Sequence, residues 1–269
     1  MTTELKIELE TVLNEQEIVL DKREVDELLD KMTLHIGHPD SYLRDQLIYK
    51  AFGKLILHDY LTGPKINDLL STCLDDKHLF FQIDEGKSDA VLTRSFSALV
   101  IALLLYKDKD IRTLPNELVQ LAILGSIDYL YKEQDYRGYI EGKGWAHSIA
   151  HGSDLLAQAI LHPIFEKKLI PDCLRVIQGC LHVEYAYIDE EEERLLAVID
   201  ALMKQGMSSE TLWTWLKQLE LLNLEPHSQY RVEWNIKLFM KALYFALEEQ
   251  SDFTHVQTWI KKQILNKVV

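Results

Sequence analysis

Apolar residues recur at intervals of three and four along almost the whole chain, which is the spacing of one face of an α-helix. Two clear examples are Val25, Leu28, Leu29 and Met32, and Leu195, Leu196, Val198, Ile199 and Leu202. The 269 residues include only 11 glycines and 6 prolines, too few to close the many turns of an all-β sandwich or barrel. The sequence therefore predicts an all-α protein.

Breaks in this pattern divide the chain into about eleven helices joined by short loops. Residues suited to helix starts follow several breaks: Asp40 or Ser41, Pro171, and Ser208 or Ser209. Short loops make successive helices antiparallel neighbours, so we predict a HEAT- or armadillo-like helical-repeat solenoid, with an irregular helical bundle as the alternative. No linker-like stretch interrupts the chain, which predicts a single domain over residues 1–269.

The charge balance restricts the expected partners. Lys and Arg number 29 and Asp and Glu 43, which gives a formal net charge of −14. Such a surface repels nucleic-acid phosphates and anionic lipid headgroups, so we expect neither nucleic acid nor a membrane as a partner. The longest apolar run, residues 98–106, is far shorter than the roughly 20 residues that cross a bilayer, which predicts a buried helix.

The cysteines and the first residues indicate the compartment. Residues 1–10 mix acidic and apolar side chains and show no secretory signal pattern. Cys73, Cys173 and Cys180 form no CxxC pair, and an odd number without metal-ligand spacing is typical of reduced core thiols. We therefore expect a cytoplasmic protein.

Residues 135–154 differ from the rest of the chain, because a glycine-rich loop with two basic residues precedes two histidines at a helix start. A helix over residues 145–158 would place four polar side chains on one side, a set that we call the polar stripe. The polar stripe consists of His147, His151, Asp154 and Gln158, and Trp145, Ile149, Leu156 and Ile160 would lie opposite. Solvent-facing helix sides usually carry Lys and Glu, so the polar stripe predicts the wall of a groove or an interior polar layer.

Metal binding is one chemistry that the polar stripe allows. His147 and His151 are one helical turn apart and could share a divalent ion, whereas Asp154 is about 10.5 Å from His147 along the axis, too far to join them. A third ligand would have to come from elsewhere. The candidates are His182, Glu184 and Glu193, and no spacing selects among them.

Two further chemistries and a structural alternative remain open. Asp154 could accept the ring N–H of His151 and make it a general base for hydrolysis. Arg137 and Lys143, beside the free N–H groups of the helix start, could instead hold an anion. In the structural alternative, the polar stripe bonds to neighbouring helices and Arg137 ties the loop down.

Other charged residues have simpler interpretations. Arg94 is expected at the lip of the core, paired with a carboxylate such as Asp89, and Arg44 and Asp45 fit the same account. The acidic run, residues 189–193, is expected to be a solvated helix start, because negative charge there suits the helix dipole.

The segment around the histidines resembles a bacterial family of helical proteins known only as a domain of unknown function. That family is marked by a Gly-Trp-x-His-x-x-Ala-His-Gly-x-Asp segment, which is matched by Gly144, Trp145, His147, Ala150, His151, Gly152 and Asp154. Residues 43–45, 94–96, 135–138 and 193–195 are also similar, so the likeness covers most of the chain. Ser153 stands where the family tends to have alanine. The resemblance implies an α-helical-repeat fold and no particular reaction.

These observations favour a protein that binds a small polar or anionic ligand, or a peptide, in a groove. The groove would be lined by Arg137, Lys143, Trp145, His147, His151, Asp154 and Gln158. A hydrolase that uses His151 with Asp154 or a divalent metal to activate water is the first alternative, and a purely structural interaction scaffold is the second.

Overall fold

The computed structural model describes residues 2–18, 20–219 and 225–266, and this part of the chain is almost entirely helical. It contains twelve α-helices: α1 (Thr2–Asn14), α2 (Lys22–Leu34), α3 (Tyr49–Leu57), α4 (Gly63–Cys73), α5 (Ala90–Ile111), α6 (Asn116–Lys132), α7 (Ser148–Leu161), α8 (Ile170–Leu181), α9 (Glu191–Lys204), α10 (Ser209–Gln218), α11 (Pro226–Ala246) and α12 (Thr254–Asn266). The predicted all-α fold is confirmed.

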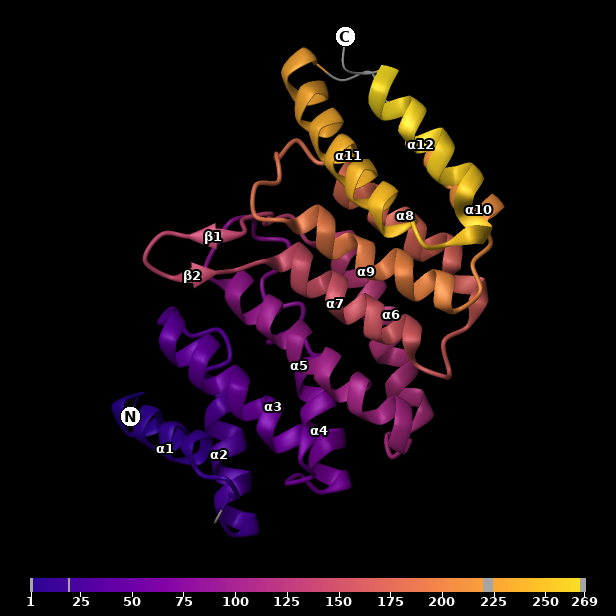
Figure 1. Cartoon of the computed structure of the whole chain (residues 1–269). Coiled ribbons are helices and arrows are strands. Elements are labelled where there is room, and N and C mark those ends of the chain that lie inside the picture. Colours follow the sequence, from indigo (N-terminus) through magenta and orange to yellow (C-terminus); the bar gives the residue numbers. More distant parts are fainter. Residues whose placement is uncertain (1, 19, 220–224, 267–269) are drawn as a thin grey trace.

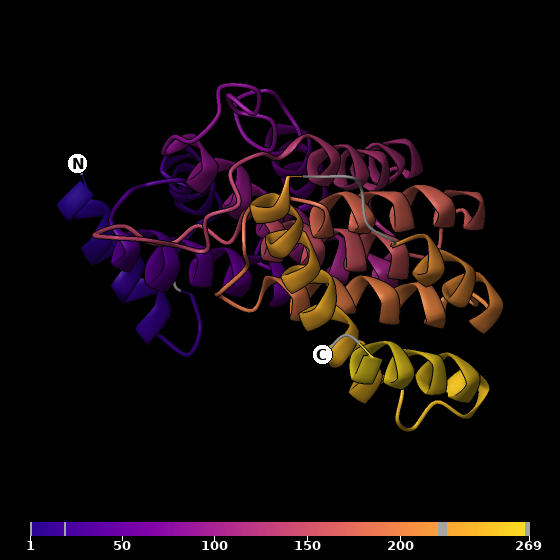
Figure 2. The same cartoon turned by 90° about the horizontal axis from the view of Figure 1, so that it is seen from above.

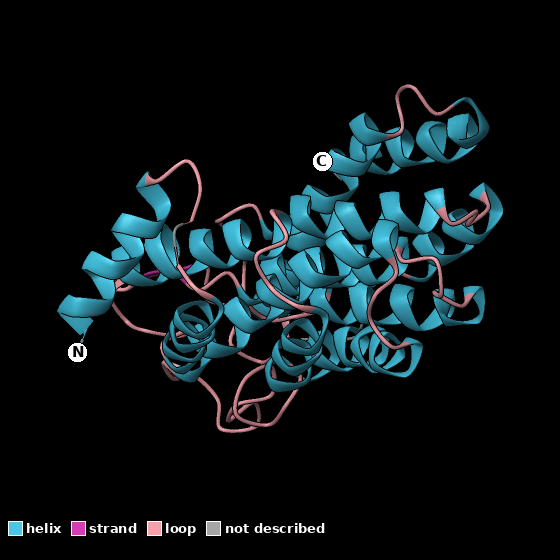
Figure 3. Ribbon diagram, turned by 90° about the horizontal axis from the view of Figure 1, so that it is seen from below, coloured by secondary structure: helices cyan, strands magenta, loops and turns pink. Residues whose placement is uncertain are grey.

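Three short helices and one hairpin complete the described elements. A π-helix, η1 (Tyr42–Ile48), runs directly into α3, and two 3₁₀ helices, η2 (Lys167–Leu169) and η3 (Ser251–Phe253), precede α8 and α12. The strands β1 (Tyr139–Ile140) and β2 (Gly144–Trp145) form an antiparallel pair, with Tyr139 opposite Trp145. In Figure 3 this pair lies among helices and connecting loops.

The helices lie in two layers (Figures 1 and 2). In one layer α3, α5, α7, α9 and α11 lie side by side, each in contact with the next. In the other, α4, α6 and α8 contact one another in the same order, and α6 also packs on α5 and α7. The N-terminal helices lie at one end and α10, α11 and α12 at the other (Figure 1). Helices two apart in the chain are thus neighbours in a layer.

Helix α5 is the centre of the core, where it contacts α3, α4, α6 and α7. The helix predicted over residues 98–106 lies within it and is buried except near its end. Among the described residues, α5 is the one helix long and apolar enough to cross a membrane, and 78% of its most apolar window is buried inside the protein. That burial is typical of the central helix of a core.

The three cysteines are free thiols in the core, as expected. Burial raises the pKa of each thiol: Cys73, Cys173 and Cys180. They are therefore poor nucleophiles.

Three predicted helix starts are confirmed. Asp40 Oδ1 accepts the N–H groups of Tyr42 and Leu43, at 2.9 and 3.2 Å. Pro171 lies in the first turn of α8, and Ser208 Oγ accepts the N–H of Thr211. At each position the residue type satisfies or removes a free backbone donor, which is why the local sequence sufficed to find it.

Candidate functional site

Helix α7 begins three residues later than the pattern predicts. It starts at Ser148, and Trp145 belongs to β2. His147 caps the helix with a left-handed backbone (φ 46°), and its N–H donates to the C=O of Gly138 at 3.2 Å. This backbone turn separates the strand from the helix. The expectation that Trp145 lies on the apolar side of α7 is wrong, and its side chain is 42% exposed.

The two imidazoles lie together at the start of α7. Their ring centroids are 5.7 Å apart, and the indole of Trp145 stacks on His147 at 4.4 Å with the planes 8° apart. The His151 ring contacts Phe96 of α5 edge-to-face, with the ring centroids 5.3 Å apart. The Arg44 guanidinium lies 4.8 Å from the Phe96 ring centroid. The His147 side chain is 20% exposed and His151 is half-buried. Both rings therefore lie at the edge of the core.

Glu191 brings a carboxylate to the imidazoles from the start of α9. Its Oε1 lies 3.6 Å from His147 Nδ1, and its Oε2 accepts the N–H of Asp189 at 3.2 Å. Glu191 is 1% exposed and Glu192 9%, so the expectation that the acidic run is solvated is wrong for these two residues. Glu191 is buried because the loop at Gly138, which is distant in the sequence, packs directly against it. A Cβ added at Gly138 would lie 2.5 Å from Glu191 Oε1.

Helix η1 brings Arg44 and Asp45 to the same place. Arg44 is fully buried; its Nη1 donates to the C=O of His38 at 2.8 Å, and its Nη2 to those of Lys143 and Trp145 at 2.8 and 3.2 Å. The predicted pair with Asp45 is present, with Nε 2.8 Å from Asp45 Oδ1. Arg44 is thus buried beneath the hairpin and fixes it to the core, whereas the sequence predicts a position at the core lip. Single π-helical turns are frequent at functional sites.

His151 is held in its neutral form. Burial lowers its pKa well below 6.5, and His147, Arg194 and Arg44 act in the same direction, while a hydrogen bond with the backbone of Ser95 opposes them. At neutral pH the ring therefore has one nitrogen without a proton. Burial raises the pKa of the nearby Asp45 carboxyl, against the attraction of Arg44 and His147.

Three buried polar atoms in this cluster make no hydrogen bond within the protein. They are His147 Nδ1, His151 Nδ1 and Glu191 Oε1. We call these three residues the imidazole site. Buried polar atoms in folded proteins usually make a hydrogen bond, so three neighbouring atoms without one have hydrogen-bonding capacity that the protein's own groups do not use.

Asp154 does not orient His151. Both its carboxylate oxygens accept from Arg194 of α9, Oδ1 from Nε at 3.1 Å and Oδ2 from Nη2. Burial raises the pKa of Asp154, and Arg194 opposes this effect. The dyad that their spacing allows is absent because α9 supplies Arg194, a cation that takes both carboxylate oxygens. Further along α7, Gln158 is half-buried and its Oε1 also lacks a partner.

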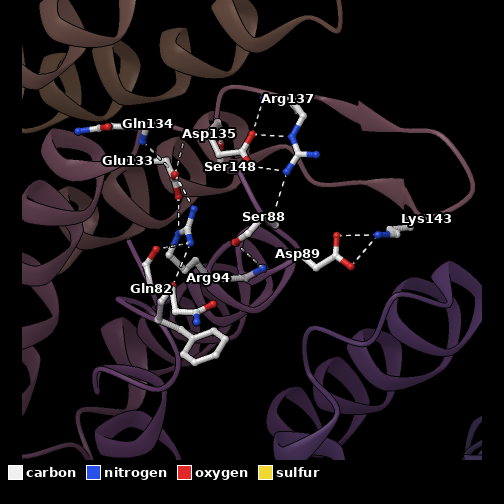
Figure 4. A network of polar contacts seen from close by, with 12 residues as sticks. Gln82, Ser88, Asp89, Arg94, Glu133, Gln134, Asp135, Arg137, Lys143 and Ser148 are labelled. Carbon is white, nitrogen blue, oxygen red and sulfur yellow. Dashed lines mark hydrogen bonds and ion pairs between the residues drawn. The ribbon is translucent and has the colours of Figure 1, made fainter. Parts of the chain in front are cut away.

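The two basic residues of the loop are engaged by carboxylates (Figure 4). Arg137 donates to both oxygens of Asp135 and, through Nη2, to the C=O of Ser88 at 2.9 Å. Lys143 Nζ lies 2.7 and 2.6 Å from the two oxygens of Asp89. Both cations are therefore neutralised by carboxylates of the protein itself. Arg137 ties the loop down, as the structural alternative predicts.

Asp89 is not the partner of Arg94, so that prediction is wrong. Arg94 is fully buried and donates to Glu133 through Nε at 2.8 Å and Nη2 at 2.7 Å (Figure 4). Asp89 lies at the exposed start of α5 and pairs with Lys143 instead. Sequence proximity favoured Asp89, whereas the packing of α5 on α6 brings Glu133 to the guanidinium.

The residues proposed as metal ligands do not assemble. In residues 2–18, 20–219 and 225–266 no three His, Cys, Asp or Glu side chains are grouped to hold a metal ion. His182 caps the end of α8, Glu184 accepts from Ser228, and Glu193 is exposed. None of these three joins the pair of His147 and His151.

Sequence reasoning missed Glu191 and Phe96, which complete the surroundings of the imidazoles. From the sequence alone, Phe96 has no role of its own beyond its place in a stretch similar to the family, and Glu191 is explained only by the helix dipole. A buried carboxylate can be recognised only once a second segment is known to cover it.

Comparisons with known proteins give a family but no activity. Residues 79–245 match the model of a family described as "Protein of unknown function (DUF2785)", which confirms the resemblance to a family of unknown function. No curated protein and no solved structure matches the chain.

Proposed function

Since this chain belongs to the DUF2785 family, its function must be inferred from its own side chains, and we propose that it binds a small polar ligand at the imidazole site. The ligand would meet His147, His151 and Glu191 beside the indole of Trp145. Asp45, Asp154 and Gln158 would lie around it.

The observation that carries this proposal is a set of three buried atoms that make no hydrogen bond: His147 Nδ1, His151 Nδ1 and Glu191 Oε1. Two of them, His147 Nδ1 and Glu191 Oε1, face each other at 3.6 Å, which is too long for a hydrogen bond. A buried polar atom without a hydrogen bond costs about 1–3 kcal/mol, so a cluster of such atoms lowers the stability of the unliganded protein. A ligand that pairs with them removes that cost, and titratable groups shifted by burial at one place are typical of binding sites.

The chemistry of the site favours a ligand that donates hydrogen bonds. A carboxylate accepts only, and neutral His151 has one nitrogen free to accept. The anionic ligand that Arg137 and Lys143 suggested has less support, because both cations are paired with Asp135 and Asp89. Amino, amide and hydroxyl groups are the matching donors.

Binding has more support here than hydrolysis. A general base needs a pKa near the working pH, and burial takes the pKa of His151 well below 6.5. The carboxylate that would have raised its basicity, Asp154, is held by Arg194.

A thermal-shift screen tests the proposal with small amines, amides, amino acids, polyols, nucleosides and carboxylates at 1 mM. A donor ligand with a Kd of about 10 μM should stabilise the protein by about 2.7 kcal/mol, which raises Tm by several degrees. The shift should disappear in His147→Gln and His151→Gln and persist in His58→Gln, a change at an exposed histidine at the end of α3.

One outcome of this screen would overturn the proposal. If no compound raises Tm, and His147→Gln and His151→Gln lower the Tm of the unliganded protein by many degrees, the imidazoles are structural and the scaffold alternative replaces the proposal.

We also propose that the two layers belong to a HEAT- or armadillo-like helical-repeat solenoid in a cytoplasmic protein. The regular contact of each helix with the next but one supports the repeat, and three buried free thiols support a reducing compartment.

A further inference from the structure

Helix α6 exposes a row of apolar side chains on the side away from the imidazole site. Leu121, Leu124 and Tyr131 are 59%, 45% and 73% exposed, and half-buried Leu118 continues the row. Their spacing of three or seven residues places them on one face of the helix. We call this row the α6 face. Single exposed apolar residues are ordinary, but a contiguous row is typical of an interaction surface.

A hollow lies on each side of the α6 face. The hollow between α4 and α6 has a volume of about 540 Å³, and its lining includes Leu74 and Phe80. The hollow between α6 and α8 has a volume of about 340 Å³, and its lining includes Leu169 and Val176. The glycine at position 125 has no side chain to fill the first hollow, where a Cβ would lie 3.4 Å from Leu74. Apolar side chains of a partner could therefore enter on both sides of α6.

Acidic residues gather at one end of this surface. A third hollow of about 530 Å³ adjoins the first and shares Leu74, Phe80 and Asp128 with it. Five carboxylates and two basic residues line the three hollows together, which gives a net charge of −3: Asp76, Asp84, Glu85, Asp128 and Asp172, with Lys132 and Arg175. Lys132 pairs with Asp128 and Arg175 with Asp172.

The remaining three carboxylates form no ion pair within the described residues. They are Asp76, Asp84 and Glu85. An acidic group of this kind at one end of the face repels a second copy of the same face and an anionic lipid surface, and it attracts a basic partner.

We infer that the α6 face is a docking surface for a basic amphipathic helix of another protein. Apolar side chains at positions i, i+3, i+4 and i+7 of that helix would lie along Leu121, Leu124 and Tyr131, in the helix-in-groove arrangement. Its Lys and Arg residues would face Asp76, Asp84 and Glu85. This surface is separate from the imidazole site and does not depend on the proposed ligand.

The probe is a fluorescein-labelled 15-residue peptide of Leu and Lys in which Leu recurs every three or four residues. Two control peptides have the same Leu and Lys residues in an order without an apolar face, or Glu in place of every Lys. Fluorescence anisotropy with the full chain should show binding of the first peptide at least tenfold tighter than of either control, and weaker binding as salt rises.

Matched variants locate the binding. The double variant Leu121→Ser with Leu124→Ser should bind the amphipathic peptide at least tenfold more weakly. The double variant Asp84→Asn with Glu85→Gln should bind it about threefold more weakly, with a smaller dependence on salt. Ile7→Ser, at a side chain of α1 that is as exposed as Leu121, should leave binding unchanged. All these positions are at the surface, and circular dichroism verifies that each variant folds.

The inference is overturned if the three peptides bind alike, or if the double leucine variant binds as well as the wild type. It is also overturned if light scattering shows a dimer that Leu121→Ser with Leu124→Ser dissociates, because a second copy then covers the face. A negative ligand screen at the imidazole site affects none of these outcomes.

Discussion

Arg94 and Glu133 form an ion pair in which both side chains are fully buried (Figure 4). Glu133 Oε1 also accepts the N–H groups of Gln134 and Asp135, at 3.0 and 2.9 Å, and Arg94 Nη1 donates to the C=O of Phe81 at 2.9 Å. The pair therefore fixes the end of α6 and the loop that follows it. Removal of one partner of a buried pair leaves the other charge without compensation, which is far more costly than the net contribution of the intact pair.

Glu133→Gln should therefore lower the free energy of unfolding by about 3–5 kcal/mol, measured by urea denaturation. The matched control is Asp128→Asn on the same helix, since the pair of Asp128 with Lys132 is about half exposed on each side and should contribute less than about 1 kcal/mol. Equal effects of the two substitutions would contradict the role given to burial.

At the scale of elements, the hairpin of β1 and β2 depends on its surroundings. Each strand has two residues, and a hairpin so short has no independent stability. It is held by Arg44, which donates to the C=O groups of Lys143 and Trp145, and by the ion pair of Lys143 with Asp89. The hairpin in turn carries Trp145 to His147, and the loop at Gly138 directly before it covers Glu191, so both shape the imidazole site.

Substitution of two glycines of the hairpin distinguishes the cost of backbone strain from the cost of steric crowding. Both have positive φ, 73° at Gly142 and 81° at Gly144, but only at Gly144 would a Cβ meet a neighbour, Ser41 Cβ at 2.7 Å. Gly142→Ala should cost roughly 1–2 kcal/mol from backbone strain alone. Gly144→Ala should cost at least about 1 kcal/mol more, because Ser41 must move to admit the added Cβ.

Thermal denaturation of the two variants measures this difference. Gly144→Ala should also change the near-ultraviolet circular dichroism of Trp145, while Gly142→Ala leaves it unchanged. The same Tm for both variants would show that the hairpin does not pack against the start of η1 in solution.

At the scale of the whole molecule, the imidazole site and the residues around it come from five elements. Asp45 comes from η1, Phe96 from α5, Trp145 from β2, His151 from α7 and Glu191 from α9. These elements are neighbours because α5, α7 and α9 lie in one layer (Figures 1 and 2). The protonation of the site is therefore coupled to global unfolding.

This coupling predicts a pH dependence of stability. The pKa of His151 in the folded protein lies well below 6.5, so below about pH 6.5 the unfolded chain takes up a proton that the folded protein does not. The contribution of His151 to stability is thus complete above pH 6.5 and is lost as the pH falls toward the pKa of the folded state. Each bound proton changes the free energy of unfolding by up to about 1.4 kcal/mol per pH unit.

Urea denaturation between pH 7.5 and 5.5 measures that slope. The free energy of unfolding should fall more steeply for the wild type than for His151→Gln, because the variant lacks the proton-binding group. His58→Gln, at an exposed position, should retain the wild-type slope. A slope unchanged in His151→Gln would show that the pKa of His151 is not lowered in the folded protein.

The sequence by itself determined the helices, several of their starts and the two imidazoles as neighbours, because each depends on contacts within a few residues. Apolar spacing, capping by Asp40 and Ser208, and the one-turn separation of His147 and His151 are local properties of the chain.

Only the tertiary structure decided which charges meet. Asp154 pairs with Arg194, Arg94 with Glu133, and Glu191 is buried against His147. A salt bridge selects its partner by distance in space, and the energy of an ionised group depends on how much water surrounds it. Both quantities are set by how α5, α7, α9 and the hairpin pack, and no interval in the sequence records them.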